Sequence, residues 1–329
     1  MTSGMLTPMK EAVTTAQERL SVQDLIAESA LTRQDLDLIF ELAADVKVAP
    51  GTYARALEGK QLAMIFEKPS LRTRTTFEVG MTSMGGFALY LDHATQRLGA
   101  REAIKDIAGN LERWVDGIVA RTFSHASVVE LAENASIPVI NGLSDLLHPC
   151  QALADFFTLE EKFGRLKGLK LAYVGDGNNV CHSLMIAGAK LGVSVHAATP
   201  PGFEPQGEIV EEAKACARNT GARIRIGHDP LEAVSGASAV YTDVWASMGQ
   251  EHQAEMRARV FAPYQVTEAL MRSAEPGAVF MHCLPAHRGL EVVDWVMDSR
   301  QSIVFDQAEN RLHVQKALLV LLMGAGQRQ

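Results

Sequence analysis

The sequence contains little cysteine and has no long apolar run. Its 329 residues include four cysteines, at positions 150, 181, 216 and 283, without the spacing of a structural zinc site. This argues against a disulfide framework and favours a reducing compartment, which we expect to be the cytoplasm. The N-terminus does not resemble a secretory signal peptide. The longest apolar run, 317–326, is too short to span a bilayer and is typical of a buried helix.

Basic residues are fewer than acidic residues. The chain has 31 Lys and Arg against 39 Asp and Glu, a formal net charge of −8 that gives no general attraction for nucleic acid or an anionic membrane. We therefore expect neither partner, and an anionic substrate would need a local basic pocket. The composition, 47% apolar and 21% charged, is that of an ordinary globular protein, and the length is enough for about two domains.

Short apolar runs alternate with helical patterns along most of the chain. Strands are predicted at residues 61–66, 117–120, 137–140, 169–174, 193–198, 223–226, 239–244, 278–282 and 303–305. Strands that alternate with helices indicate parallel sheets with helices on both faces. The predicted fold class is therefore α/β, with two such domains.

Helix signals divide the chain. Pro149 and Gly164 bracket a long helix over 148–163, which we expect to join a first domain (1–150) to a second (151–308). A last helix from about residue 309 is expected to pack back on the first domain. Near the N-terminus, Thr32 and Asp35 resemble a capping box that opens a helix with an apolar face of Leu36, Ile39, Phe40 and Ala43.

Polar residues gather where predicted strands end, and ligands of open parallel sheets bind at those ends. The first such junction is Ser70-Leu71-Arg72-Thr73-Arg74, a turn followed by a helix. Free N–H groups at a helix start, together with guanidinium groups, form a good phosphate cradle. The alternative is an ordinary helix cap with surface arginines. Arg121 follows another strand and could contact the same anion.

Two further junctions point to small polar ligands. His148 and Gln151 lie on one side of the first turn of the long helix, where both could hydrogen-bond a small polar group or His148 could simply cap the helix. The segment 175–180 resembles a dinucleotide fingerprint, but Val180 replaces the third glycine and no acidic residue follows the next strand. We therefore discount a nicotinamide cofactor.

The last junctions are the segments 243–249 and 282–285. Asp243 could pair with an amine, and Cys283 could line the reacting centre. A Cys-His nucleophile is conceivable, but no helix start follows Cys283 to lower its pKa. His282 and His287 have no third ligand nearby in the sequence, so we expect no metal site.

Together these segments resemble the ornithine carbamoyltransferases of the aspartate/ornithine carbamoyltransferase superfamily. The similarity rests on residues 66–74, 148–151, 243–249 and 282–285, in that order, and extends over about residues 20–322. It implies transfer of a carbamoyl group from carbamoyl phosphate to the δ-amine of L-ornithine, without a cofactor or metal. It also implies a homotrimer, or a multiple of trimers, with active sites between subunits.

The resemblance also assigns residues. It implies that carbamoyl phosphate is held by Ser70, Leu71, Arg72, Thr73, Gln96, Arg121, His148, Gln151 and Arg311, with Gln96 reaching across from a neighbouring subunit. Ornithine would be held by Asn179, Asp243, Ser247, Met248, Cys283 and Leu284. Arg121, His148 and Cys283 would act at the reacting centre.

Several points stay open in the sequence. The family usually has Thr where this chain has Leu71, so only the backbone N–H remains there for phosphate. The acceptor could be another amine, such as N-acylated ornithine, putrescine or aspartate, and a catalytically silent relative is a further alternative. The same residues would serve arginine synthesis or degradation.

Overall fold

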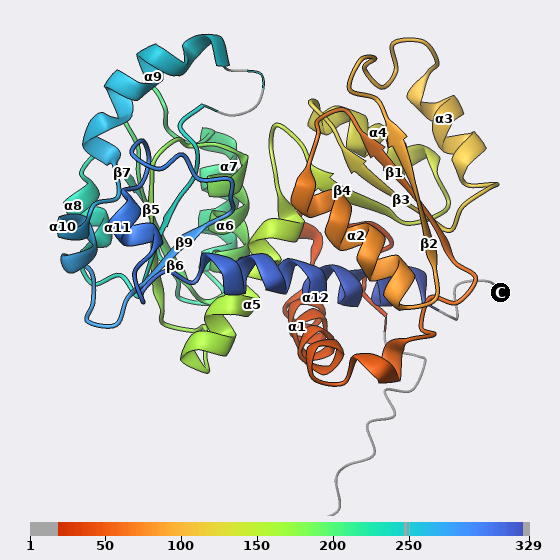
Figure 1. Ribbon diagram of the computed structural model, residues 1–329, viewed down its shortest axis with the longest axis horizontal. Helices are drawn as coiled ribbons and strands as arrows, with labels where there is room; N and C mark the ends of the chain where they lie inside the picture. Colours follow the sequence, from red (N-terminus) through yellow and green to blue (C-terminus); the bar gives the residue numbers. More distant parts are fainter. Residues whose placement is uncertain (1–18, 247–248, 250, 325–329) are drawn as a thin grey trace, which may run out of the picture.

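Two parallel sheets, each surrounded by helices, organise the chain (Figure 1). The computed structural model describes residues 19–246, 249 and 251–324. Both sheets consist of parallel strands linked by helical crossovers, so the predicted α/β class is confirmed. No helix in the described part of the chain is long and apolar enough to cross a membrane.

The first domain contains a four-stranded sheet in the order β2-β1-β3-β4. Its strands are β1 Gln61–Phe66, β2 Phe87–Asp92, β3 Gly117–Arg121 and β4 Val139–Leu143. The helices of this half are α1 Arg33–Val48, α2 Leu71–Ser83, α3 Ile104–Leu111 and α4 His125–Asn134, with short 3-10 turns η1 Glu28–Ala30 and η2 Pro50–Tyr53. Buried apolar residues fill β1, β3 and β4, as is typical of strands covered on both faces.

The second domain contains a five-stranded sheet in the order β7-β6-β5-β8-β9. Its strands are β5 Lys170–Val174, β6 Ser194–Ala198, β7 Ile224–Gly227, β8 Ala239–Thr242 and β9 Val279–His282. The helices are α6 Asn179–Leu191, α7 Gly207–Ala217, α8 Pro230–Val234, α9 Ala254–Phe261, α10 Glu268–Arg272 and α11 Asp294–Met297, with 3-10 turns η3 Glu251–Gln253 and η4 Ala262–Tyr264.

Two helices connect the sheets. The helix α5, Pro149–Phe163, lies between the lobes, and α12, Val304–Met323, runs across both of them (Figure 1). In the structure α12 packs against α1, α2 and α5. One hydrophobic core continues through these helices from the first domain into the second. Burial of this shared core therefore holds the two domains together.

Most predicted elements are present, and two predictions need correction. The capping box is confirmed: Thr32 Oγ1 accepts from Asp35 N at 3.1 Å, and Asp35 Oδ2 accepts from Thr32 N at 2.7 Å. The strand predicted at 303–305 is wrong, because α12 begins at Val304, about five residues earlier than expected. The edge strand β2 was not predicted, although its first five residues, Phe87 to Leu91, form a continuous apolar run of the kind that indicated the other strands.

The strand order places the ligand crevice. In the first sheet the chain leaves β1 for β2 on one side and returns to β3 on the other, so the carboxyl ends of β1 and β3 meet at a switch point. In the second sheet β5 and β8 meet in the same way. The polar junctions that follow these four strands therefore come together between the domains.

Candidate active site

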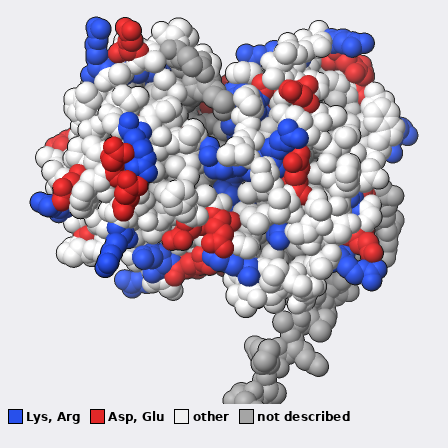
Figure 2. All heavy atoms as spheres, in the orientation of Figure 1, with Lys and Arg blue, Asp and Glu red and all other residues white. Residues whose placement is uncertain are grey.

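A cavity of about 490 Å³ lies between the two domains. Figure 2 shows lysine and arginine side chains gathered along the junction of the two lobes. Of the residues predicted from the sequence, the cavity brings together Ser70, Leu71, Arg72, Thr73, Arg121, His148, Gln151, Asn179, Asp243, Cys283, Leu284 and Arg311.

The first wall is the start of α2. Ser70 is its N-cap and accepts from Thr73 N at 3.2 Å, so the first backbone N–H groups of the helix face the cavity end. Arg72 is half-buried and lines the cavity, whereas Arg74 lies outside it and pairs with Glu78 at 2.9 Å. The Leu71 side chain is 76% exposed, so this residue offers the cavity chiefly its backbone. The junction thus presents one arginine and a helix dipole to an anion.

Four cations converge on this wall. Burial, and then the charges of Arg311 and Arg72, lower the pKa of Arg121 to about 9. Burial and the charge of Arg121 likewise lower the pKa of Lys68 to about 8. Among the described residues, the buried Nε atoms of Arg121 and Arg311 have no hydrogen-bond partner. Packing like charges away from water is unfavourable, so the wall is suited to a multiply charged anion.

The start of α5 supplies neutral groups beside these cations. Burial, and then the charges of Arg311, Arg121, Arg72 and Lys68, lower the pKa of His148 well below its usual value, so the imidazole is neutral. Its backbone N–H donates to Ser183 Oγ at 2.8 Å. One turn along, Gln151 Oε1 accepts from Arg311 Nη1. A neutral imidazole can donate one hydrogen bond to a carbonyl oxygen without adding charge.

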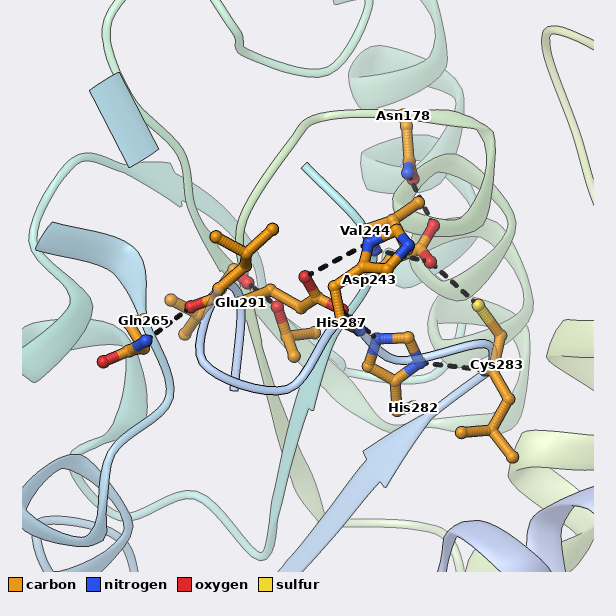
Figure 3. A network of polar contacts seen from close by, with 12 residues as sticks. Asn178, Asp243, Val244, Gln265, His282, Cys283, His287 and Glu291 are labelled. Atoms are coloured by element: carbon orange, nitrogen blue, oxygen red, sulfur yellow. Dashed lines mark hydrogen bonds and ion pairs between the residues drawn. The ribbon is translucent and has the colours of Figure 1, made fainter. Parts of the chain in front are cut away.

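The second domain supplies an acidic wall. Asp243, directly after β8, accepts from Asn178 Nδ2 at 2.7 Å and from the Cys283 thiol at 3.0 Å (Figure 3). Asn178 is the N-cap of α6, and its Oδ1 accepts from Val180 N at 3.0 Å. Neighbouring Asn179 donates to Ser144 O at 2.6 Å. The carboxylate of Asp243 is therefore held in place opposite the cations of the first wall.

Three groups here lie within range of a shared metal ion: ligand atoms of Asp243, His282 and Cys283 are within 4.8 Å of one another. Both ring nitrogens of His282 are already engaged, Nδ1 accepting from Leu284 N at 2.8 Å and Nε2 facing Glu291 Oε1 at 3.3 Å (Figure 3). Burial, and then Asp243, raise the pKa of Cys283 well above its usual value. A protonated thiol is a poor metal ligand, so these residues fit a hydrogen-bond network better than a metal site.

The raised thiol pKa leads to a first prediction. Because only the thiolate is nucleophilic, we expect Cys283→Ser to retain at least about one-tenth of the wild-type kcat. Steady-state turnover measures this, with Cys216→Ser, outside the cavity, as a control. Complete loss of activity together with an acyl-enzyme detected by mass spectrometry in the wild type would instead support covalent catalysis by the thiol.

Three of the residues predicted for the site are not among the described residues that line the cavity. Gln96 is exposed and does not line the cavity of its own chain. Ser247 and Met248 lie outside the described residues. Lys68 also lines the cavity but was not predicted, although it precedes Ser70 by two residues and lies in the same turn. Asn178 was not predicted either. It is adjacent to Asn179 in the sequence, and the sequence alone does not indicate which of the two asparagines donates to Asp243.

Comparison with known proteins identifies the family. The two-domain α/β fold places an anion cradle opposite an acidic wall, an arrangement suited to an anionic and a cationic substrate, and both halves of the chain match one family of transferases. Residues 23–161 match the carbamoyl-P binding domain, and residues 167–322 the Asp/Orn binding domain, of aspartate/ornithine carbamoyltransferase. The chain therefore belongs to the aspartate/ornithine carbamoyltransferase family.

Several relatives of this chain carry the name ornithine carbamoyltransferase. The chain is 54% identical to the ornithine carbamoyltransferase of Thermococcus kodakarensis, over 93% of this chain and 98% of the relative. It is 53% identical to the anabolic ornithine carbamoyltransferase of Pyrococcus furiosus, over 93% and 98%. A solved structure of ornithine carbamoyltransferase from Pyrococcus furiosus superimposes with a TM-score of 0.89, covering 92% of this chain and 98% of that one.

Proposed function

We propose that this protein transfers the carbamoyl group of carbamoyl phosphate to the δ-amine of L-ornithine, giving L-citrulline and phosphate. The observation that carries the proposal is the cavity itself, where the cationic start of α2 faces the carboxylate of Asp243 across the domain junction. An anionic donor and a cationic acceptor would thus approach from opposite walls. The family and the names of the relatives support the same reaction.

Carbamoyl phosphate binds to the first wall. Its phosphate lies against Ser70, the backbone of Leu71, Arg72, Thr73 and Arg121, where N–H groups and guanidinium forks match a dianion. Its carbamoyl group lies beside His148, Gln151 and Arg311.

Ornithine binds to the second wall. Its α-amino and carboxylate groups are held by Asn179, Asp243, Ser247 and Met248, while its δ-amine lies beside Cys283 and Leu284. The neutral δ-amine attacks the carbamoyl carbon, a C–N bond forms, and the C–O bond to phosphate breaks. The nitrogen loses one proton, which the departing phosphate takes up to leave as hydrogen phosphate.

Catalysis follows from placement and electrostatics. Arg121 and the neutral His148 donate to the oxygen that becomes negative in the tetrahedral intermediate, each well-placed donor contributing roughly 3 kcal/mol. Arg72 neutralises the departing phosphate. Closure of the domains aligns the two reactants and excludes water, which lowers the entropic part of the barrier.

The proposed assembly is a homotrimer or a multiple of trimers, in the cytoplasm. Gln96 is exposed at the end of the first sheet, where it is available to complete the site of a neighbouring subunit. The reaction needs neither cofactor nor metal, and the substrates are small molecules.

The acceptor is tested directly. Purified protein and carbamoyl phosphate are incubated separately with ornithine, N-acetylornithine, N-succinylornithine, putrescine and aspartate, and carbamoylated product and phosphate are measured. We expect product with ornithine alone. Product with a different amine would retain the carbamoyl phosphate half of the proposal and overturn the ornithine half, and no product with any amine would indicate a silent relative.

Activity should rise with pH. A primary amine has a pKa of about 10.4 in water, so the reactive neutral form increases as the pH approaches that value. The lowered pKa of His148 and the raised pKa of Cys283 leave both groups neutral through this range, so neither produces the rising limb. Lys68 and Arg121 have pKa values of about 8 and 9, so carbamoyl phosphate is kept saturating, because its negative charge favours their protonated forms. We expect kcat/KM for ornithine to climb between about pH 7 and 9, and a flat profile from about pH 6 to 9 would contradict direct attack by the amine.

A further inference from the structure

A buried carboxyl group lies behind the cavity and does not line it. Asp155 is on α5, one turn after Gln151, and is 0% exposed. Its Oδ1 atom accepts two amide hydrogen bonds, from Gln151 Nε2 at 2.7 Å and from Gln307 Nε2 of α12 at 2.6 Å. Within the described chain its Oδ2 atom has no hydrogen-bond partner.

One branch from Asp155 leads to the first wall. A glutamine amide can be turned either way, and donation to Asp155 fixes Gln151 with its oxygen toward Arg311. Arg311 Nη2 in turn donates to Thr73 Oγ1 at 3.1 Å, in the first turn of α2. The orientation of Gln151 and the guanidinium of Arg311 therefore both depend on an acceptor at Asp155.

A second branch leads to the opposite wall. Gln307 Oε1 accepts from His282 N at 3.0 Å, at the end of β9 and next to Cys283. The same Gln307 donates to Tyr241 OH at 3.1 Å. One oxygen of Asp155 thus orients two amides, each of which holds one of the two walls.

We infer that Asp155 is a positioning residue that sets the spacing and orientation of the two substrate-binding walls through Gln151 and Gln307. This inference rests on the proposed carbamoyl transfer. Asp155 touches neither substrate and acts by fixing groups that do.

The chemistry of the site supports an acceptor role. Burial raises the pKa of Asp155 to about 7, against the hydrogen bonds from Gln151 and Gln307 and the charge of Arg311. A carboxylate that is costly to bury contributes little net stability. The network requires an oxygen that accepts hydrogen bonds from the amides of Gln151 and Gln307. An asparagine side chain also has such an oxygen.

Two substitutions at Asp155 separate positioning from charge. Asp155→Leu removes the acceptor, and we expect kcat to fall by about a hundredfold and KM for both substrates to rise, since misplaced groups cost about that much. Asp155→Asn keeps an acceptor oxygen, so we expect its kcat to stay within about tenfold of wild type. Loss of activity by Asp155→Asn equal to that of Asp155→Leu would overturn the acceptor role.

A matched control lies one turn further along α5. Thr158 is buried and accepts from Asn310 Nδ2 of α12 at 3.0 Å, but this contact leads outward to Glu161 and Lys47. Thr158→Val should lower the melting temperature and leave kcat within about twofold. If Asp155→Leu also lowered only the melting temperature, the residue would be merely structural and the inference would be wrong.

A substitution in the Gln307 branch tests the network independently, and it does not depend on whether Asp155→Leu folds. Gln307→Leu should raise KM for ornithine and leave carbamoyl phosphate binding, measured by calorimetry, within about twofold. Effects of Asp155→Asn and Gln307→Leu should also be non-additive, because the two side chains are in contact. Additive effects would contradict the network.

The wild-type assay separates this inference from the proposed function. If the wild type makes no carbamoylated product, the proposed function fails. If the wild type is active and neither the Asp155 variants nor Gln307→Leu show the expected changes, the inference fails on its own.

Discussion

Arg121→Met should lower kcat by about a thousandfold while leaving the free protein at least as stable as the wild type. Methionine has a similar length and fills the buried position without a charge. It removes a donor to the developing oxyanion and a contact to phosphate, each of which contributes to transition-state stabilisation. It also relieves the repulsion from Arg311 and Arg72 that lowers the pKa of Arg121. The activity and the stability should therefore change in opposite directions.

Two measurements check this result: steady-state turnover, and the melting temperature with and without phosphate. Phosphate should stabilise the wild type by neutralising the cations, and should stabilise the variant less. Arg74→Ala is the control, because Arg74 lies outside the cavity in an ion pair with Glu78, and its kcat should stay within about threefold. Near-normal turnover by Arg121→Met would remove Arg121 from the reacting centre.

Local signals in the sequence were sufficient to predict some parts of the fold. Local signals were sufficient for the helix that begins after Thr32, because the capping box is complete within four residues. They were sufficient for β1, β3 and β5, because strands buried on both faces are continuously apolar. The same signal is present in β2, whose first five residues are continuously apolar, so this strand was missed although its sequence indicated it.

Other features could not be predicted from the sequence because they depend on contacts between residues that are far apart in the chain. Residues 303–305 are apolar enough for a strand, but the hydrogen bond from Gln307 N to Ile303 O begins a helix there. Each cavity residue could be selected as a polar group after a strand, and the parallel topology then brings these groups together. The role of Asp155 could not be predicted, because its partner Gln307 is 152 residues away.

The acidic wall gives the second large effect. Asp243→Asn should raise KM for ornithine by about one to two orders of magnitude, with little change in carbamoyl phosphate binding. Asparagine keeps the shape of the side chain and an oxygen that accepts from Asn178, but it removes the negative charge that pairs with an ammonium group.

Calorimetry with carbamoyl phosphate and kinetics with varied ornithine measure the two halves separately. Asp229→Asn provides the matched control, because Asp229 follows β7 of the same sheet, caps α8 and lies outside the cavity. Asparagine is an equally good helix cap, so both substrates should bind this variant normally. If Asp243→Asn instead weakened carbamoyl phosphate and left ornithine unchanged, the two walls would be assigned the wrong way round, since a carboxylate repels the anionic donor and attracts the cationic acceptor.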